Sequence, residues 1–414
     1  MDNRKKIAIF TQFYPFGKGE EFLENELRTA ENLFGEIALI SFSGDTGNIT
    51  KYLPENATVI PVREKIGRTK LFFLRFFSLF SSDVWRQTAV CVRERGLKTW
   101  YIGLKSAVLE RSQIQILKAQ EDAWVGKYDI YYSYWLSGAA SYLALRKDRL
   151  HAPIISRAHG YDCFFSRAFH PHRKEQLEKL DMIFSISEAG RKDLNRQGCD
   201  PNKIYVARLG VDRSGNTLSS GNGRKEKTIV TCSNIVNLKR LDLMIEALSL
   251  IEDLSIRWVH FGDGVLKDYI TELAEEKLSK KAGISYEFCG WVPQKKIIEF
   301  YQREPISVFV NCSDVEGIPV SIMEAMSYGI PCIARDVGGN GEVVVNNKNG
   351  ILLPQKCSAE MLADGIMKLI TLCDEDYMQM RAEAYRQYAE KYNAQVNYSQ
   401  FWDTVLNFAP SDCK

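Results

Sequence analysis

Short apolar runs alternate with amphipathic stretches along nearly the whole chain. The runs are rich in β-branched and aromatic residues, as is typical of buried strands, and most are separated by segments long enough for a helix. This alternation predicts parallel sheets with helices on both faces, which is a doubly wound α/β fold. The expected strands are residues 7–10, 37–42, 130–134, 153–157, 182–187, 204–209, 228–232, 256–261, 285–289, 307–311 and 331–334.

A polar segment rich in glycine and serine, residues 214–227, divides this pattern into two halves of similar size. It has hardly an apolar residue that could anchor it to a core, which is typical of a linker. The 414 residues are enough for two domains of about 200 residues each. We expect Rossmann-like domains over 1–213 and 228–394, facing a central cleft, and an aromatic helix over 395–414 that returns to the first domain.

The composition is that of an ordinary globular protein, with 45% hydrophobic and 26% charged residues and a formal net charge of +2. No global field would attract nucleic acid, so any bound anion must be held by local groups. The ten cysteines include no CxxC pair, which favours reduced thiols and a cytoplasmic location over disulfides or zinc. The sequence shows no signal peptide and no apolar run of about 18 residues that could span a membrane.

The most apolar stretch is LFFLRFFSLF, residues 71–80. On a helix, Arg75 and Ser78 would lie on one polar stripe, with phenylalanines over the rest of the surface. Basic residues precede it, with only Glu64 opposing them. Two interpretations stay open: an aromatic core helix with a solvated stripe, or a helix that lies in the headgroup layer of a membrane. The basic residues are Arg63, Lys65, Arg68 and Lys70.

Two carboxylates stand eight positions apart in a strand-loop-helix segment. Glu316 lies in the loop that follows the expected strand 307–311, and Glu324 lies in the helix that begins near residues 319–320. The free N–H groups of that helix end would favour a phosphate. A capping box from Ser321 would explain Glu324 but not Glu316. Two ionised carboxylates beside an anion site suit a ligand that carries both phosphate and hydroxyl groups, such as a nucleotide sugar.

The run EGIPVSIMEAMSYGIPCIARDVGGNGEVV, residues 316–344, resembles the E-x7-E signature of the retaining glycosyltransferases of the GT-B fold, the group 1 family found in surface polysaccharide synthesis. The EAM, G-x-P and VGG-x-x-E-x-V segments follow at the spacing of that family. The resemblance implies that Glu316 holds the hydroxyls of the donor sugar and that Glu324 holds the ribose. It also assigns the turn between them, Gly317, Ile318 and Pro319, to substrate binding.

The segment 233–248 is similar to the strand-loop-helix with which this family binds the diphosphate. Lys239 falls on the lysine of the motif, whereas Asn234 stands where an arginine is usual. Two buried phosphates need cationic partners. We expect a second cation, with Arg240 ahead of Arg208, although Arg240 could instead cap a helix.

Other glycine-containing segments also resemble segments of the group 1 glycosyltransferases. Residues 260–274 look like the GDG turn of the family, and they do not complete a GxGxxG fingerprint because Lys267 takes the third position. The FCGWVP segment, 288–293, resembles the loop over the nucleobase, and Val292 is its expected contact. In the first half, Gly17 and Gly19 would let the backbone approach a ligand closely.

The SRAHGYDCF segment, residues 156–164, resembles the histidine loop of the family. The resemblance implies that His159 faces the donor sugar and that Arg157 and Asp162 also bind substrate. A lone histidine in a strand-end loop can equally be structural, and both possibilities stay open on the residues alone.

We expect no essential metal and no cofactor. Asp374 and Asp376 form a D-x-D, but they lie between helical stretches, where a helix cap is the simpler explanation. A helix end together with Lys239 could neutralise a leaving diphosphate without a cation.

The sequence therefore predicts a retaining hexosyltransferase that moves a sugar from a nucleoside diphosphate to a saccharide or lipid-linked glycan in bacterial surface polysaccharide synthesis, of the capsule or lipopolysaccharide type. Its expected location is the cytoplasm or the inner face of the cell membrane, with residues 71–80 as the membrane contact and no nucleic acid partner. The alternatives are a nucleotide-sugar epimerase or hydrolase of the same fold and a non-catalytic sugar-binding subunit.

Overall fold

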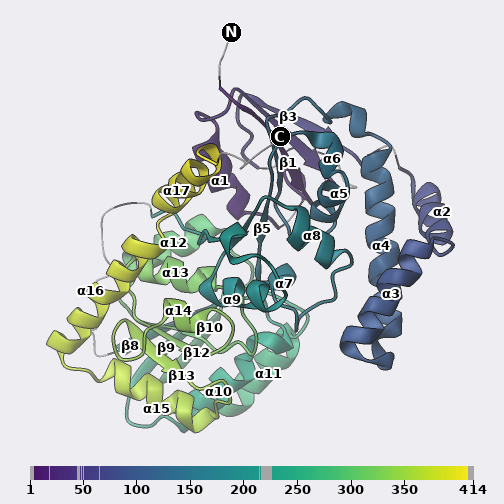
Figure 1. Ribbon diagram of the computed structural model, residues 1–414. Helices are drawn as coiled ribbons and strands as arrows, with labels where there is room; N and C mark the ends of the chain where they lie inside the picture. The colour runs from purple at the N-terminus through teal and green to yellow at the C-terminus, as the bar shows by residue number, and fades with distance from the viewer. Residues whose placement is uncertain are drawn as a thin grey trace. The chain divides into compact units, whose positions relative to one another are not determined.

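The chain folds into two compact units in a computed structural model (Figure 1). The structure describes residues 4–408 except 18, 44–46, 48, 50, 65, 214 and 216–225. Unit 1 comprises residues 1–209 and 395–414, and unit 2 comprises residues 210–394. Unit 2 thus begins earlier than the expected boundary at 228, and most of the expected linker lies outside the described residues.

Unit 1 is built on a parallel sheet of seven strands in the order β3-β2-β1-β4-β5-β6-β7. The central strands are buried on both faces, so they are continuous apolar runs. The chain leaves β1 for one edge and later returns to β4 beside it, which makes β1 and β4 the switch point of the sheet. The strands are β1 Lys6–Thr11, β2 Glu36–Ser41, β3 Ala57–Pro61, β4 Ile130–Ser133, β5 Ile154–Ala158, β6 Met182–Ser185 and β7 Ile204–Val206.

Helices cover this sheet, and α2, α3 and α4 extend from it as a group of their own (Figure 1). The helices of unit 1 are α1 Phe22–Ala30, α2 Arg68–Ser78, α3 Ser82–Arg95, α4 Trp100–Lys118, α5 Ala139–Leu145, α6 Lys147–Leu150, α7 Gly160–Cys163, α8 Arg173–Lys179, α9 Glu188–Arg196 and α17 Ala394–Leu406, with short 3₁₀ turns η1 Leu97–Thr99, η2 Glu121–Ala123 and η3 Pro201–Lys203.

Unit 2 has a parallel sheet of six strands in the order β10-β9-β8-β11-β12-β13, with its switch point between β8 and β11. Its strands are β8 Glu226–Cys232, β9 Ser255–Phe261, β10 Ile284–Phe288, β11 Ile306–Asn311, β12 Cys332–Arg335 and β13 Gly350–Leu353. Its helices are η4 Asn237–Lys239, α10 Leu241–Leu250, α11 Lys267–Leu278, α12 Gln294–Arg303, α13 Val320–Ser327, α14 Asn340–Val343, α15 Ala359–Ile370 and α16 Asp374–Lys391.

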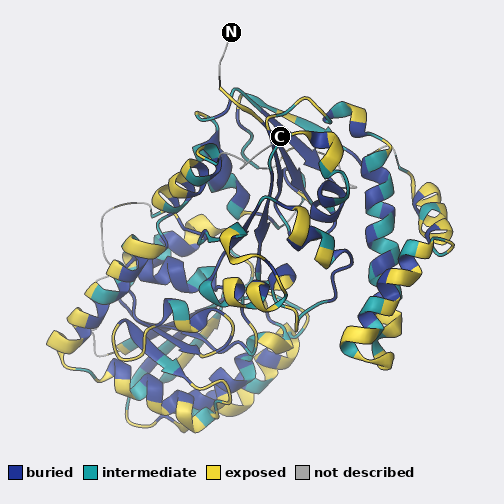
Figure 2. Cartoon of the chain, in the orientation of Figure 1, coloured by how far each residue is buried: buried dark blue, intermediate teal, exposed yellow. Residues whose placement is uncertain are grey.

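The expected doubly wound α/β fold is confirmed, and every expected strand is present. Two strands were not expected, β3 and β13, and both stand at an edge of their sheet. Figure 2 shows the difference between buried strands and exposed outer helix faces in both units. The aromatic helix α17 lies in unit 1, where Trp402 Nε1 donates a hydrogen bond to Glu26 O at 3.1 Å.

No helix among the described residues is long and apolar enough to cross a membrane. Nine cysteines are described, and all of them are free thiols. Asp374 and Asp376 lie in the acidic first turn of α16, as a helix start requires.

Candidate functional site

The expected donor-binding residues gather at the switch point of unit 2, where the loops after β8 and β11 meet. Because β8 and β11 are hydrogen-bonded neighbours in a parallel sheet, both loops leave the same edge. The backbone joins them directly, since Asp314 N donates to Leu238 O at 2.8 Å. This edge of a doubly wound sheet is where such folds bind ligands.

Lys239 and Glu316 form an ion pair across these two loops. Lys239 ends the 3₁₀ turn η4, and its Nζ lies 2.5 Å from Glu316 Oε1. Asn311 Nδ2, at the end of β11, donates to the same oxygen at 3.2 Å. Glu316 is 9% exposed, so the pair lies in a site with little water, where both charges act strongly.

Glu324 occupies the second turn of α13 rather than a capping position. The alternative explanation, a capping box from Ser321, is excluded, because Pro319 is the residue that precedes the helix and Ser321 already lies inside it. The Glu324 carboxylate instead accepts a hydrogen bond from Gln294 Nε2, at the start of α12. Burial raises the pKa of Glu324 to about 7, and the bond from Gln294 opposes this only in part.

Cys232, the last residue of β8, connects the two halves of this cluster. Burial, with a smaller contribution from the charge of Glu324, raises the pKa of its thiol to about 12, and the charge of Lys239 opposes the rise. Both charges therefore lie close enough to act on this thiol. The Lys239–Glu316 pair and Glu324 thus both lie near the end of β8.

Glycines allow the loops to approach this closely. A Cβ on Gly262 would lie 1.8 Å from Ser233 O, so the GDG turn can rest on the β8 loop only without a side chain there. Gly338 has a φ of 57°, and its Cβ would lie 2.0 Å from Glu316 O. The GDG and VGG segments thus support the loops that carry Lys239 and Glu316.

Arg240, the expected second cation, already has two carboxylate partners. Its guanidinium lies 2.9 Å from Asp242 Oδ2 and 3.5 Å from Asp314 Oδ1. The bond to Asp242 raises the pKa of Arg240 most. Arg240 directly precedes α10, and its two carboxylate partners fit a structural role at the start of that helix better than a contact with phosphate. Arg208 lies in unit 1, 3.8 Å from Glu188.

The remaining expected contacts of unit 2 offer backbone rather than side-chain groups. The Ile318 side chain is buried in the core of unit 2, and Gly339 N donates to Gly317 O at 2.7 Å. Val292 is half-buried in the loop before α12. Gln294, which follows this loop, was not predicted, and only its position directly after FCGWVP could have indicated it.

In unit 1, the glycine-containing loop after β1 is organised by a residue that was not predicted, Glu20. Its carboxylate accepts the backbone N–H groups of residues 12, 13 and 14 at 2.7 to 2.8 Å, and it accepts Trp135 Nε1 at 2.7 Å. Trp135 follows β4, so Glu20 bridges the switch point of unit 1. Gly17 and Gly19 lie in this loop, and Gly19 has a φ of 96°. The only sequence signal that could have indicated Glu20 is its position directly after Gly19.

His159 follows β5, and its ring lies between Tyr134 and Trp135, with centroid distances of 4.8 and 4.5 Å. Its Nε2 is 3.1 Å from Tyr134 O, so Nε2 carries the proton and donates. Burial lowers the pKa of His159 to about 3, and the nearby Arg157 charge lowers it too. The ring is therefore held as the neutral tautomer with its proton on Nε2.

The substrate contacts of Arg157 and Asp162 stay predictions, and the structure gives both side chains partners inside unit 1. Arg157 is fully buried and is held 2.9 Å from Glu26 Oε2, with further donation to Ala207 O at 2.9 Å. The Asp162 carboxylate is also buried and accepts Leu136 N and His159 N, both at 2.6 Å. Both side chains stabilise the loop from inside unit 1.

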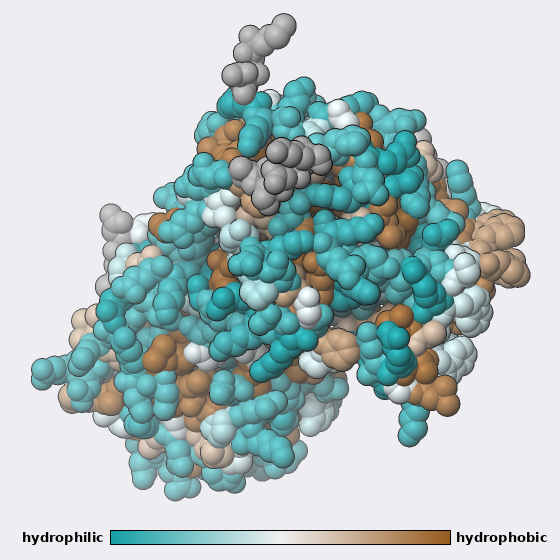
Figure 3. Space-filling view, in the orientation of Figure 1, coloured by the Kyte–Doolittle hydropathy of each residue, from teal (hydrophilic) through white to brown (hydrophobic). Residues whose placement is uncertain are grey.

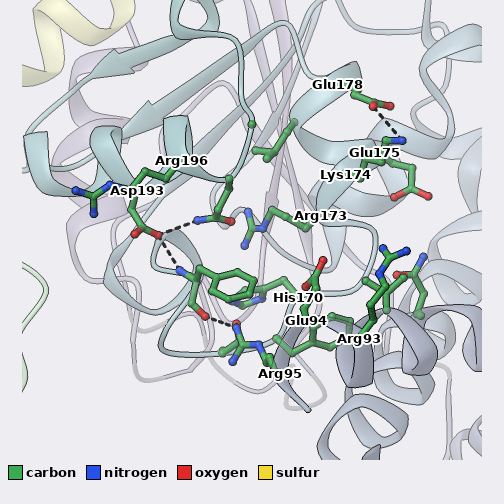
Figure 4. A pocket seen from close by; sticks show the side chains of 18 of the residues that line it. Arg93, Glu94, Arg95, His170, Arg173, Lys174, Glu175, Glu178, Asp193 and Arg196 are labelled. Carbon is green, nitrogen blue, oxygen red and sulfur yellow. Dashed lines mark hydrogen bonds and ion pairs between the residues drawn. The ribbon is translucent and has the colours of Figure 1, made fainter. Parts of the chain in front are cut away.

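A cavity of about 840 Å³ lies elsewhere in unit 1, between α3, α8 and α9 (Figure 4). Arg173 stands in its wall and donates from Nη2 to Asp162 O at 2.5 Å, so the cavity adjoins the histidine loop. Lys174 is paired with Glu178 at 3.7 Å, and Asp193 accepts Phe165 N at 2.8 Å. The lining carries six arginine or lysine side chains and four carboxylates, so the cavity is basic on balance.

Comparisons with known proteins agree with this geometry. Residues 217–387 match the family model of glycosyl transferases group 1, and residues 87–214 match that of glycosyltransferase family 4. The chain belongs to the group 1 glycosyltransferases of the GT-B fold, and it is therefore an enzyme that transfers a glycosyl group.

A similar curated protein is the amylovoran biosynthesis glycosyltransferase AmsK of Erwinia amylovora, 21% identical over 98% of this chain and 100% of AmsK. Among solved structures, the lipopolysaccharide outer core galactosyltransferase WaaB has a TM-score of 0.68 at 17% identity, covering 97% of this chain and 99% of WaaB. Anabaena HepE in complex with UDP and glucose has a TM-score of 0.66 at 15% identity, covering 98% of this chain and 100% of HepE. Both likenesses support the fold.

Proposed function

We propose that this enzyme moves a hexose-type sugar from a nucleoside diphosphate to a saccharide or lipid-linked glycan, with retention of anomeric configuration, in bacterial surface polysaccharide synthesis. The observation that carries the proposal is the Lys239–Glu316 pair at the switch point of unit 2. The name of AmsK supports the polysaccharide setting, and the UDP and glucose bound to HepE support a nucleotide-sugar donor.

Departure of the diphosphate is the step that needs the most help. Lys239 and the unbonded N–H groups at the start of α13 would stabilise the negative charge that develops on the leaving group. No side chain caps that helix end, which directly follows the loop that carries Glu316. When the donor binds, the phosphate replaces Glu316 as the partner of Lys239.

Glu316, released from Lys239, would then accept hydrogen bonds from the donor-sugar hydroxyls and face the positive anomeric carbon. Glu324 would hold the ribose hydroxyls, with Gln294 fixing the orientation of its carboxylate. The Val292 loop and the Gly317–Pro319 turn would contribute backbone contacts to the base and the sugar. Ionised carboxylates suit vicinal hydroxyls because each oxygen accepts more than one hydrogen bond.

Retention follows from attack on the same face that the diphosphate leaves. The bond between the anomeric carbon and the phosphate oxygen breaks, and the acceptor oxygen forms the new bond. The leaving phosphate takes the proton from the acceptor hydroxyl, so no protein base is required. This agrees with the neutral state of His159, whose role would be to contact the donor sugar rather than to move a proton.

We further propose that the first domain receives the acceptor, with Gly17 and Gly19 next to the reacting groups. The reaction needs no resident metal, because Lys239 and the helix end provide the positive charge. The enzyme would work in the cytoplasm at the inner face of the cell membrane, in contact with it through residues 71–80.

The test is a screen of uridine, guanosine and adenosine diphosphate sugars by thermal shift, because a ligand that binds the folded form stabilises it. The stabilising donor is then incubated with a lipid-linked glycan fraction, with and without a chelator. We expect acceptor-dependent transfer that the chelator leaves unchanged, and a product whose proton NMR coupling shows the donor's anomeric configuration.

Three results would contradict the proposal. Consumption of the donor without an acceptor would indicate an epimerase or hydrolase, and complete loss of activity with the chelator, restored by manganese, would require a metal. An inverted product would exclude same-face attack.

A further inference from the structure

Helix α2 packs against α4 by one narrow side only. Leu71 and Ser78 are buried there, Leu74 is partly buried, and Ser78 Oγ donates to Leu74 O at 2.7 Å. The expected polar stripe is therefore wrong for Ser78, which faces the protein. Figure 2 shows most of the α2 surface as exposed.

The outer side of α2 is aromatic. Its phenylalanines, with Phe80 just after the helix, are between 45% and 75% exposed. At about 100° per residue these rings cover an arc of roughly 140° opposite the buried side. The rings contact one another in series, from Phe72–Phe76 at 6.4 Å to Phe76–Phe80 at 5.6 Å. The core interpretation of this helix is thus wrong, because each of the rings is at least 45% exposed. The five are Phe72, Phe73, Phe76, Phe77 and Phe80.

Basic residues border the aromatic arc on both sides. On the same helical projection, Arg68 and Arg75 lie along one border and Lys70 along the other. All three are exposed, and no acidic residue lies in the first turn of α2. Lys65 of the expected basic run lies outside the described residues.

A second group of exposed apolar side chains lies at the turn between α3 and α4. Leu97, Trp100, Tyr101 and Ile102 are each at least half exposed, and Lys98 stands among them. Trp85, in the first turn of α3, adds an exposed indole whose Nε1 donates to Leu79 O at 2.8 Å. Figure 3 shows hydrophobic side chains over α2 and again lower on the same edge, over the α3–α4 turn.

We propose that α2 and the α3–α4 turn form one docking face for a lipid bilayer that carries anionic headgroups. The phenylalanine rings would enter the boundary between headgroups and acyl chains, and Arg68, Lys70 and Arg75 would lie against the phosphates. Trp100 and Tyr101 suit the same depth, because their rings combine an apolar body with a polar end.

Charge and composition favour a bilayer over a protein partner. An aromatic arc with cations along both borders matches a headgroup layer, in which negative charge surrounds the inserted rings on every side. The α3–α4 turn extends the contact beyond residues 71–80. Unit 1 would therefore touch the bilayer at two places, α2 and this turn. The inference refines the peripheral location proposed above but does not depend on the transfer reaction.

The test is co-sedimentation of the full chain with vesicles of phosphatidylcholine alone and with vesicles containing phosphatidylglycerol. We expect binding to the anionic vesicles that falls on the order of tenfold or more in a Phe72→Ser, Phe76→Ser, Phe77→Ser variant. Replacing Arg68 or Lys70 by Gln should weaken binding by roughly fivefold for each cation.

The matched control is a triple variant of equally exposed apolar residues in unit 2: Leu250→Ser, Met361→Ser and Met378→Ser. It should bind vesicles as the wild type does. Nucleotide-sugar affinity should stay the same in all variants, which separates this proposal from the transfer reaction.

Wild-type protein that does not bind anionic vesicles, or a phenylalanine variant that binds as well as the control, would overturn the proposal. Equal binding to both vesicle types would exclude the role of the cations. A concentration-dependent dimer in sedimentation equilibrium, lost in the phenylalanine variant, would assign the face to a second copy of the chain instead.

Discussion

At the scale of single residues, Glu324 stands out in the site of unit 2 because its surroundings oppose its charge. It is almost fully buried, and its carboxylate accepts a hydrogen bond from the neutral side chain of Gln294. A carboxylate in this position is unfavourable when ionised unless a ligand donates hydrogen bonds to it. The hydroxyls of a bound ribose would provide them.

The raised pKa of Glu324 gives a prediction with a definite sign. Its pKa rises from 4.5 in the unfolded chain to about 7 in the folded protein, so the contribution of Glu324 to stability is present below about pH 4.5 and is lost as the pH rises through 7. Glu324→Gln should therefore equal the wild type in acid and exceed it by about 3 kcal/mol in the free energy of unfolding above neutral pH.

The same substitution should weaken nucleotide binding on the order of tenfold or more, because an amide replaces an ionised acceptor. Denaturant unfolding across the pH range and calorimetric titration with the nucleotide measure both effects. A variant with unchanged nucleotide affinity would show that Glu324 is only a buried structural acid.

The sequence could predict the residue types of this site but not all of their partners. Lys239, Glu316 and Glu324 follow from the motif and its place at a strand end. Arg157 also lies in a motif at the end of a strand, as those three residues do. Its guanidinium, however, forms a buried ion pair with Glu26, 131 positions earlier in the chain. Only tertiary packing decides whether such an arginine faces a ligand or the core.

At the scale of elements, the interior strands and the edge strands β7 and β10 were predictable, whereas the edge strands β3 and β13 were not. The interior strands are buried on both faces and are therefore unbroken apolar runs. Strand β3 is partly exposed along its whole length, and β13 is only four residues long and starts with a glycine. Neither leaves a periodic signal strong enough to recognise.

The α3–α4 hairpin is held to α8 by a buried cluster around His172. The ring lies 2.9 Å from Glu110 Oε1 and 3.1 Å from Asp83 Oδ2, and Arg86 and Arg111 also face Asp83. Burial alone would lower the pKa of His172, but the hydrogen bonds to Asp83 and Glu110 outweigh it and raise the pKa to about 9.

This cluster should make the stability of unit 1 depend on alkaline pH. Because the pKa is raised from 6.5 to about 9, the stabilisation is complete below pH 6.5 and is lost as the pH rises through 9. The loss should be about 2 kcal/mol, allowing for partial exposure. His172→Asn should abolish this pH dependence, measured as the unfolding midpoint against pH.

His151→Asn is the matched control, because His151 is exposed and Asn tolerates its positive φ. It should keep the alkaline slope of the wild type. An unchanged slope in His172→Asn would show that another group causes the pH dependence.

At the scale of the whole molecule, two sheets of the same type each place functional loops at their own switch point. In unit 2, Lys239 and Glu316 join the loops after β8 and β11. In unit 1, Glu20 and Trp135 join the loops after β1 and β4. The alternation of apolar runs predicted both sheets, and the motifs predicted Lys239 and Glu316, whereas Glu20 and Trp135 had to be found in the structure.

The measurement that tests the central claim most directly is kcat/KM for sugar transfer by Lys239→Ala beside Lys348→Ala. Lys348 is the matched control, since it also pairs with a glutamate of unit 2, Glu383 at 3.6 Å, away from the switch point. The account predicts that Lys239→Ala loses about a hundredfold or more with its fold intact by circular dichroism, and that Lys348→Ala keeps normal activity. Equal activity in the two variants would contradict it.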